Sequence, residues 1–383
     1  MTLTQDKNNN NSIGVGLIGT GFMGKCHALA YGSVKAVFGA VPTPRLEVLC
    51  DVPSEKASAF ADQFGFARST DTWQDLVVDP AVDIVCITAP NKVHKEMALA
   101  ALGAGKHVHL EKPMALTIAD ANELRDAAAS AGVKTITGYN YLHNPAITHA
   151  HQLIESGAIG RVVHFRGAID EDYQADPDLA WTWRAMKTEA GLGALGDLGC
   201  HLVSIATYLA GPIASLMADM QTIHHTRPVA DGGASRAVEN EDVASALVTF
   251  ETGAQGVLTT SRSAWGRKSH IGFEVHGTEG MITFDQERMN ELRLYQNRGA
   301  LAEQGFKTIL SGPAHPPYGE FVPAAGHQLG FNDLKVIEVH EFLKAIAEDR
   351  LAFPAFADAF HFEDVIHAIA ASSRAGTRVS IKG

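Results

Sequence analysis

The stretch that decides the fold of this chain is Val15-Gly16-Leu17-Ile18-Gly19-Thr20-Gly21-Phe22-Met23-Gly24. It places an apolar, strand-like run before a Gly-x-Gly-x-x-Gly turn, and a helical run follows the turn. A nucleotide-binding turn needs both flanks, a strand before it and a helix after it. The same glycine spacing occurs twice without these flanks, at Gly14/Gly16/Gly19 inside the strand and at Gly191/Gly193/Gly196 with no strand leading into it. We therefore expect only the turn at residues 19–24 to bind a nucleotide.

Each part of this turn has a role in holding a dinucleotide. Gly19 allows the tight turn, Gly21 lets the backbone approach the pyrophosphate, and Gly24 lets the helix pack closely on the strand. The pyrophosphate would lie at the helix N-terminus, where free N–H groups and the helix dipole favour an anion. Phe22 and Met23 complete the turn and are expected to contact the cofactor. The alternative is an ordinary α/β turn without a ligand.

An acidic residue ends the next apolar run. Asp51 lies 27 residues after Gly24, whereas the usual spacing to the ribose-binding acid is about 20 residues. We attribute the excess to a loop insertion marked by Pro42 and Pro44. A carboxylate at this place accepts hydrogen bonds from ribose hydroxyls and repels a 2′-phosphate. No arginine follows in residues 51–54, so the sequence favours NAD over NADP; the alternative is a surface aspartate.

Residues 13–140 alternate short apolar runs with longer helical stretches. Near-continuous apolar strands that alternate with helices predict a parallel sheet covered on both faces, as in a Rossmann dinucleotide-binding domain. The predicted strands are Gly14–Ile18, Leu46–Cys50, Ile84–Thr88, His107–Leu110 and Thr135–Thr137, and the predicted helices are 24–32, 54–64, 93–103 and 117–131.

After residue 140 the rhythm changes, and several segments alternate apolar and polar residues. That pattern predicts a second, α+β domain at 141–383 with a large, mostly antiparallel sheet that has one open face. We expect a long loop at 299–330, which is rich in Gly and Pro, and a flexible tail at 1–12. The predicted strands are 161–169, 213–224, 242–250, 254–264, 269–276, 280–284 and 291–296, and the predicted helices are 145–156, 332–348 and 358–373.

Length and composition agree with a two-domain globular protein. The 383 residues exceed what one core usually supports, roughly 250–300 residues. A net charge of −12 argues against nucleic acid or an anionic membrane surface as a partner. The N-terminus lacks the apolar core of a secretory signal, and no apolar run of membrane-spanning length is present, so we expect a cytoplasmic protein. The four cysteines, Cys26, Cys50, Cys86 and Cys200, are scattered with no pair spacing, and three of them lie in apolar contexts that predict reduced, buried thiols.

A charged residue ends the strand predicted at 107–110. In Glu111-Lys112-Pro113, the lysine lies 88 residues after Gly24, at the carboxyl end of a strand where a doubly wound sheet opens its ligand crevice. An ammonium group there indicates chemistry on a molecule bound beside a nucleotide. The alternative is a lysine that leaves the strand into solvent.

A second glycine-rich stretch, Gly193-Ala194-Leu195-Gly196-Asp197-Leu198-Gly199-Cys200-His201, precedes an apolar helical run. Asp197 and His201 are four residues apart, which on a helix places them on one face. A histidine can take a proton from an alcohol and return it, and a carboxylate can orient its ring. The alternatives are a helix-capping aspartate with a structural histidine, or a shared metal ion. We expect no metal, because chance pairs are common among 18 histidines.

Together these features resemble the Gfo/Idh/MocA oxidoreductase family, over residues 13–375. Within it the chain is most similar to members that act on levoglucosan, through residues 21–31, 273–284, 312–320 and 335–348. The motifs that carry the family resemblance are GLIGTGFMG (16–24), APNKVH (89–94), EKP (111–113) and GDLGCH (196–201).

The resemblance implies roles for individual residues. Lys112 corresponds to a lysine that contacts the reacting hydroxyl and the nicotinamide ribose, and its bond to Pro113 is often cis in such proteins. His201 corresponds to the general acid/base, with Asp197 as its carboxylate partner. Expected cofactor contacts are Ala89, Asn91, His94, Glu111, Lys112, Asn140, Trp183 and Arg184, and expected substrate contacts are Lys112, Tyr141, His143, Arg184, Asp197 and His201.

The resulting hypothesis is an NAD-dependent dehydrogenase that oxidises a secondary hydroxyl of a cyclic polyol or pyranose, such as levoglucosan or an inositol. Two alternatives from the same fold are a glycoside hydrolase that uses NAD transiently and a non-catalytic sugar or nucleotide sensor. Related proteins are commonly dimers or tetramers, so we expect a homodimer or homotetramer.

Overall fold

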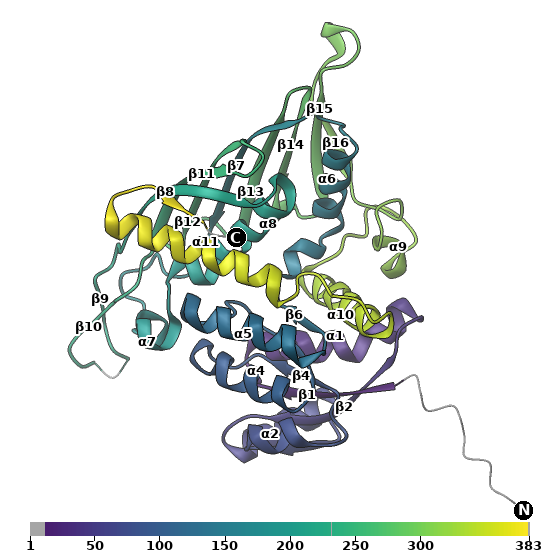
Figure 1. Ribbon diagram of the computed structural model, residues 1–383, viewed down its shortest axis with the longest axis vertical. Coiled ribbons are helices and arrows are strands. Elements are labelled where there is room, and N and C mark those ends of the chain that lie inside the picture. Colours follow the sequence, from purple (N-terminus) through teal and green to yellow (C-terminus); the bar gives the residue numbers. More distant parts are fainter. Residues whose placement is uncertain (1–11, 231, 382–383) are drawn as a thin grey trace, which may run out of the picture. The chain divides into compact units, whose positions relative to one another are not determined.

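The computed structural model describes residues 12–230 and 232–381 and divides into two compact units (Figure 1). The N-terminal unit contains the chain up to Glu111 together with residues 122–138 and 331–358. All other described residues belong to the C-terminal unit. Most of the predicted tail at 1–12 lies outside the described residues, and Ser12 is the first residue of a strand, not part of a tail.

The N-terminal unit is built on a six-stranded parallel sheet in the order β3-β2-β1-β4-β5-β6. The strand order reverses between β1 and β4, and in such sheets ligands bind beyond the carboxyl ends of the strands at that point. Ile18 and Ile87, which end these two strands, are paired directly. The strands are β1 (Ser12–Ile18), β2 (Thr43–Cys50), β3 (Arg68–Thr70), β4 (Ile84–Ile87), β5 (His107–Leu110) and β6 (Thr135–Thr137). The helices that begin in the loops between them are α1 (Phe22–Phe38), α2 (Ser54–Phe64), α3 (Trp73–Val78), α4 (His94–Gly103) and α5 (Ile118–Ala131).

Two local predictions for this unit need correction. Helix α1 continues to Phe38 and does not end near residue 32, and β2 already begins at Thr43, so Pro44 lies inside a strand. The long spacing to Asp51 therefore comes mainly from a long helix and not from a loop insertion. The short elements β3 and α3 were not predicted, because three strand residues and six helix residues carry too little periodicity.

A helix from far along the chain also belongs to this unit. Helix α10 (Phe331–Ala347) packs along α1, with the rings of Phe38 and His340 stacked 3.7 Å apart. The predicted division into 13–140 and 141–383 is therefore incomplete, because residues 331–358 return to the N-terminal unit and 112–121 belong to the other. Sequence order hides this arrangement, since α10 packs against a helix that begins 309 residues earlier.

The C-terminal unit contains a nine-stranded mixed sheet in the order β16-β15-β14-β13-β7-β12-β11-β8-β17. All neighbouring strands are antiparallel except β7 and β12. Burial alternates along β11, so one face of the sheet is packed and the other is exposed, as predicted. The strands are β7 (Val162–Asp170), β8 (Ile213–Gln221), β11 (Val243–Phe250), β12 (Gln255–Ser261), β13 (His270–Gly277), β14 (Gly280–Asp285), β15 (Glu291–Gln296), β16 (Lys307–Leu310) and β17 (Val379–Ser380), and a separate hairpin is formed by β9 (Thr226–Arg227) and β10 (Arg236–Ala237).

Helices cover the packed side of this sheet. Helix α8 (Cys200–Ala210) lies on β7 and β13, and α6 (Pro145–Glu155) packs on α8. Helix α11 (Phe356–Ala375) is the last helix of the chain, and from Ala359 onward it belongs to this unit. The segment 299–330, predicted as a loop, contains the strand β16 and the short helix α9 (Tyr318–Phe321). Four-residue elements between Gly and Pro give too weak a pattern to be recognised.

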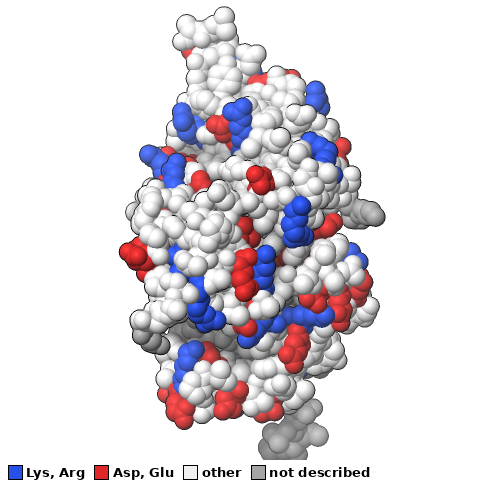
Figure 2. Space-filling model, turned by 90° about the vertical axis from the view of Figure 1, so that its left-hand side faces the viewer, with Lys and Arg blue, Asp and Glu red and all other residues white. Residues whose placement is uncertain are grey.

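All four cysteines are free and buried, one more than the three that the sequence predicted. One apolar helical stretch, Lys187–Ala210, is long enough to cross a membrane, but 78% of its apolar window is buried inside the protein. That burial is the behaviour of a core helix in a globular domain. On the face of the described residues drawn in Figure 2, acidic and basic side chains are interspersed.

Candidate active site

The glycine turn has the geometry of a dinucleotide cradle. Gly19 has a φ of 99°, which disfavours any residue with a side chain. A Cβ on Gly24 would overlap the carbonyl oxygen of Gly19, whereas the space beside Gly21 is open for 4 Å. Gly21 is the N-cap of α1 and provides no side-chain cap. The first N–H groups of the helix therefore face space that a pyrophosphate fits.

Asp51 stands at the end of β2 and is held by its neighbours. Its carboxylate accepts hydrogen bonds from the N–H and hydroxyl of Thr20, from the N–H of Val52 at 2.6 Å and from Lys56 at 2.8 Å. Burial alone would raise its pKa, but these hydrogen bonds outweigh burial and lower it. An ionised carboxylate is thus fixed beside the glycine turn, and its contact with the ribose hydroxyls stays a prediction.

The loop after β4 is tied to the same turn. The hydroxyl of Thr88 donates to the carbonyl oxygens of Ile18 and Gly19, at 3.0 and 2.9 Å. Further along, the ring of His94 is buried and donates from Nε2 to the carbonyl of Ala89 at 2.8 Å. His94 therefore closes the 89–94 loop from inside, which shapes the loop that carries Asn91. Thr20 and Thr88 were missed in the sequence, because single threonines beside a glycine turn form no recognisable pattern.

Glu111 differs from its expected role as a cofactor contact. Its carboxylate is buried and bonded to His27 at 2.7 Å and to Lys335 at 2.6 Å. It is part of a buried ionic cluster, defined here as His27, Tyr31, His109, Glu111, Lys335 and Glu338. The side chain is thus engaged in the core of the N-terminal unit, unlike the expected contact with a cofactor. Such carboxylates and imidazoles can hold a metal ion, but here the ammonium of Lys335 provides the cation between the two carboxylates.

Lys112 bonds to the glycine-rich stretch at residues 193–201 within the C-terminal unit. Its Nζ donates to the backbone carbonyl of Asp197 at 2.6 Å and to the carboxylate Oδ1 at 3.0 Å. The lysine side chain is 15% exposed and that of Asp197 is 39% exposed, so the pair lies at a surface that small molecules can reach. The bond between Lys112 and Pro113 is cis, as the family resemblance implied. The alternative of a lysine pointing into solvent is wrong.

The backbone between Asp197 and His201 is not the regular helix that was assumed. Residues Leu195–Gly199 form a π-helix that continues directly into α8, which carries His201. In a π-helix the hydrogen bonds run to the fifth residue, so two residues four apart no longer lie directly above each other. Short π-helical segments of this kind occur frequently at functional sites. The carboxylate of Asp197 instead faces Lys112.

A tyrosine that the sequence did not reveal completes this cluster. The hydroxyl of Tyr173 donates to Oδ2 of Asp197 at 2.6 Å. Burial would raise the pKa of Asp197, but Lys112, Tyr173 and the charge of Arg184 together lower it, so the group is a carboxylate at neutral pH. Glu171, two residues before Tyr173, has its pKa raised by burial and by the charge of Asp197. Both residues follow β7, and no local sequence pattern connects them with residue 197.

The ring of His201 is buried between two tyrosines. Tyr141 and Tyr139 lie edge-on to it, at centroid distances of 4.8 and 5.7 Å. Tyr141 also bonds to the hydroxyl of Ser269 at 3.2 Å. The neighbouring Asn140 is 2% exposed, and its Nδ2 has no hydrogen-bond partner among the described residues. A buried amide donor without a partner is costly, which fits a group that binds a ligand.

Three other predicted contacts lie in short 3-10 helices of the same unit. His143 ends the turn Asn140–His143 that carries Tyr141. Trp183 and Arg184 begin the turn Trp183–Ala185, with the guanidinium 4.7 Å from the ring centroid. Phe22, by contrast, is a largely exposed residue of the N-terminal unit and stacks on Phe331 at 5.7 Å.

Comparison with known proteins identifies the family. The "Oxidoreductase family, NAD-binding Rossmann fold" profile matches residues 13–139, and the "GFO/IDH/MocA C-terminal domain" profile matches residues 147–283. The chain belongs to the GFO/IDH/MocA oxidoreductase family. Its N-terminal domain is therefore an NAD-binding Rossmann domain, and the predicted fold class, enzyme class and cofactor are confirmed.

Individual family members are similar over almost the whole chain. Levoglucosan dehydrogenase of Pseudarthrobacter phenanthrenivorans is 39% identical over 378 residues, covering 94% of this chain and 96% of that protein. A levoglucosan dehydrogenase structure in complex with NADH and levoglucosan superposes with a TM-score of 0.94 at 38% identity, covering 97% of this chain and all of that one. An NAD-binding oxidoreductase from Klebsiella pneumoniae has a TM-score of 0.94 at 41% identity over the same shares.

Proposed function

We propose that this protein is an NAD-dependent dehydrogenase that oxidises a secondary hydroxyl of a pyranose, an anhydrosugar such as levoglucosan, or a cyclic polyol. The observation that carries the proposal is the contact between Lys112 and Asp197, held at 2.6 and 3.0 Å beside a helix that bears His201. An ammonium and a carboxylate at a partly exposed surface, next to a helix that carries a buried imidazole, are the groups that alcohol oxidation needs. Similarity to levoglucosan dehydrogenase supports the substrate class.

The residues divide the reaction between them. NAD, when bound, accepts the hydride from the carbon that bears the hydroxyl. Lys112 stabilises negative charge on the substrate oxygen as its proton leaves, an electrostatic contribution that a fixed ammonium provides without reorganising. His201 takes that proton as the general base. Because the pKa of Asp197 is lowered, Asp197 stays ionised and orients the ammonium of Lys112 rather than accepting the proton.

Two substitutions test these roles. Lys112→Ala should lower kcat by about 100- to 1,000-fold, the effect of removing one oxyanion donor. His201→Ala should lower it by about 100- to 10,000-fold, the range for general acid–base catalysis. NADH binding, followed by fluorescence titration, should remain in both variants. Lys307→Ala, which changes an exposed lysine on β16, is the control and should leave kcat unchanged; near-normal turnover of both site variants would refute the assignment.

The substrate and cofactor are found in one screen. Reduction of NAD⁺ and of NADP⁺ is followed at 340 nm with levoglucosan, inositols, glucose and other pyranoses. We expect oxidation of at least one of them, with NAD⁺ preferred because the ionised Asp51 repels a 2′-phosphate. Release of a sugar from a glycoside without net NADH would instead support the hydrolase alternative.

The open face of the sheet supports self-association. Leu247 and Met217, paired across β11 and β8, are 55% and 45% exposed on this face. Exposed apolar neighbours of this kind favour burial against a second copy. We propose a homodimer or homotetramer in the cytoplasm, and light scattering after gel filtration measures the state; replacing both residues with Asp should shift it toward monomer.

A further inference from the structure

Glu363 is a fully buried carboxyl in α11 that the proposed reaction does not use. Its exposed fraction is 0%. The Oε1 atom accepts a hydrogen bond from the backbone N–H of Met114 at 2.6 Å. The Oε2 atom has no hydrogen-bond partner among the described residues, and Nε2 of His367 lies 3.8 Å from it. A buried carboxyl with one satisfied oxygen is unfavourable compared with an apolar side chain, so its single bond needs an explanation.

That bond holds the loop that presents Lys112. Met114 is buried and lies two residues after the lysine. Pro113, between them, has no N–H to anchor the backbone. The Met114 N–H is thus the first backbone donor after Lys112, and buried donors of this kind must be paired. With Nζ bound to Asp197 at one end and Met114 bound to Glu363 at the other, the lysine is held from two sides.

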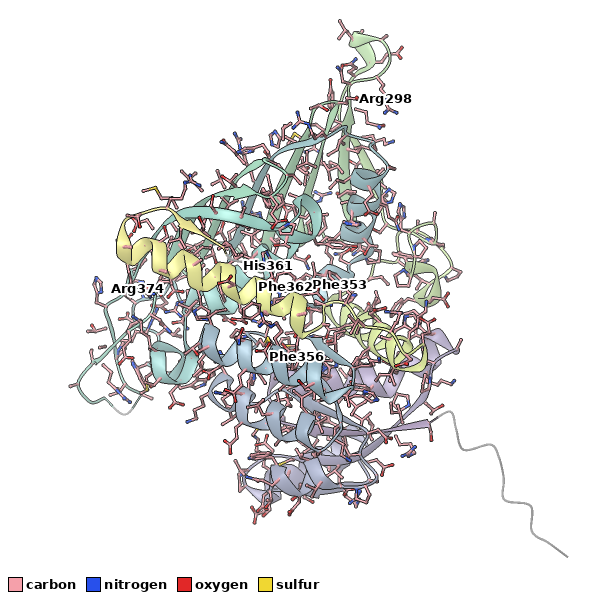
Figure 3. The ribbon with its side chains drawn as sticks, in the orientation of Figure 1. Arg298, Phe353, Phe356, His361, Phe362 and Arg374 are labelled. Carbon is pink, nitrogen blue, oxygen red and sulfur yellow. The ribbon has the colours of Figure 1, made fainter. Side chains whose placement is uncertain are left out.

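The adjacent residue of α11 supports the other half of the site. The ring of Phe362 lies edge-on to Tyr139 at 5.1 Å, and Tyr139 lies edge-on to His201 at 5.7 Å. Figure 3 shows Phe362 on α11 beside His361. The consecutive residues Phe362 and Glu363 of α11 therefore support the proposed general base and the proposed charge-stabilising lysine.

We propose that Glu363 is a positioning residue for Lys112, acting through its hydrogen bond to the Met114 peptide. This inference rests on the function proposed for Lys112. The groups that face Glu363 are Lys112 from the loop, Cys200 from α8 and His367 from its own helix. Burial raises the pKa of Glu363 to about 8, although the Met114 bond and the charge of Lys112 oppose this. At pH 7 the group is therefore mostly protonated, and glutamine is a close substitute.

Two variants distinguish the role of Glu363 as a hydrogen-bond acceptor from a role as a side chain that only fills space. Glu363→Gln keeps the volume and an oxygen acceptor, and should retain kcat within about threefold. Glu363→Leu fills similar space without an acceptor, and should lower kcat by about 10- to 100-fold, because small displacements of a catalytic group are costly. The dissociation constant for NADH should stay unchanged in both. Asp364→Asn, the next residue of α11, is the control.

The measurements use the full-length protein and whichever sugar or cyclitol of the panel above is oxidised fastest. Full activity of Glu363→Leu would overturn the inference, and so would a loss in Glu363→Gln as large as in Glu363→Leu. Should Glu363→Leu not fold, Glu363→Gln alone decides, since a loss above tenfold contradicts a role for the acceptor. Lys112→Ala is assayed in parallel: if it remains active, the proposed function fails, whereas if only the Glu363 variants remain active, the positioning role fails.

Discussion

Replacing Lys335 with methionine should destabilise the N-terminal unit in a pH-dependent way. The ammonium of Lys335 is fully buried, 2.6 Å from Glu111 and 2.9 Å from Glu338. It depresses the pKa of both carboxyls, that of Glu338 to about 2, despite the opposing effect of burial. Methionine fills similar space but leaves two buried carboxylates without a cation. Removing one partner of a buried ion pair costs about 3–5 kcal/mol.

The cost cannot exceed that of protonating a carboxyl, because a buried carboxyl in the variant can take up a proton instead of staying charged. Keeping a carboxyl protonated at pH 7.5, when its pKa in the unfolded chain is about 4.3, costs about 4 kcal/mol. At pH 5 the same step costs about 1 kcal/mol. In the wild-type protein the depressed carboxyl pKa values provide stability that is present above the unfolded pKa and lost only as pH falls toward about 2. The loss in the variant should therefore shrink from about 4 to about 1 kcal/mol between pH 7.5 and pH 5.

His27 acts in the same direction. Its pKa is lowered to about 4 by burial and by the charges of Lys335 and His109. Without Lys335 the imidazole accepts a proton more readily at pH 5 and compensates a carboxylate. The stability that the variant loses at pH 5 should therefore be smaller still.

Differential scanning calorimetry at the two pH values measures the effect. For a domain of this size, about 4 kcal/mol corresponds to a fall in Tm of roughly 8–16 °C, and about 1 kcal/mol to roughly 2–4 °C. Lys344→Met on the same helix, where the lysine is 49% exposed, is the control and should stay within about 0.5 kcal/mol. A loss below about 1 kcal/mol at pH 7.5, or an equal loss at both pH values, would refute the reasoning.

Two further predictions concern the site. Tyr173→Phe removes a donor from the Asp197 carboxylate, so the carboxylate should hold the Lys112 ammonium less firmly and kcat should fall roughly tenfold. The acidic limb of the kcat/KM profile, which the general base His201 sets, should not move; an unchanged kcat would show that the tyrosine hydroxyl does not support the pair. Gly24→Ala places a methyl group against the Gly19 carbonyl, whereas Gly32→Ala in the same helix meets open space. In an NADH titration, Gly24→Ala should bind NADH at least tenfold more weakly than the wild-type protein. Gly32→Ala should bind it with unchanged affinity.

Several parts of the site followed from the sequence because their information is local. A strand, three glycines and a helix are adjacent in the chain, so the turn at residues 19–24 could be selected from its decoys. Asp51 and Lys112 could be singled out because each follows an apolar, strand-like run, where the carboxyl ends of parallel strands favour ligand binding. Tyr173, which bonds to Asp197, and Glu363, which bonds to the Met114 peptide, could not be found in the same way, since they approach these groups only after the C-terminal unit has folded.

The sequence by itself determined the order of elements, the class of each domain and the chemical groups available for catalysis, because hydrophobic periodicity and turn residues act over a few positions. Tertiary structure decided which of these groups meet. It buried the Glu111 side chain in the core against Lys335, which lies 224 residues away in the sequence. It also gave the backbone at Asp197 the form of a π-helix in place of a regular helix. It also assigned α10 to the N-terminal unit. The positions of Glu111 and α10 depend on which distant segment a charge or an apolar face packs against, and hydrophobic periodicity shows that a face is buried without naming the segment that covers it.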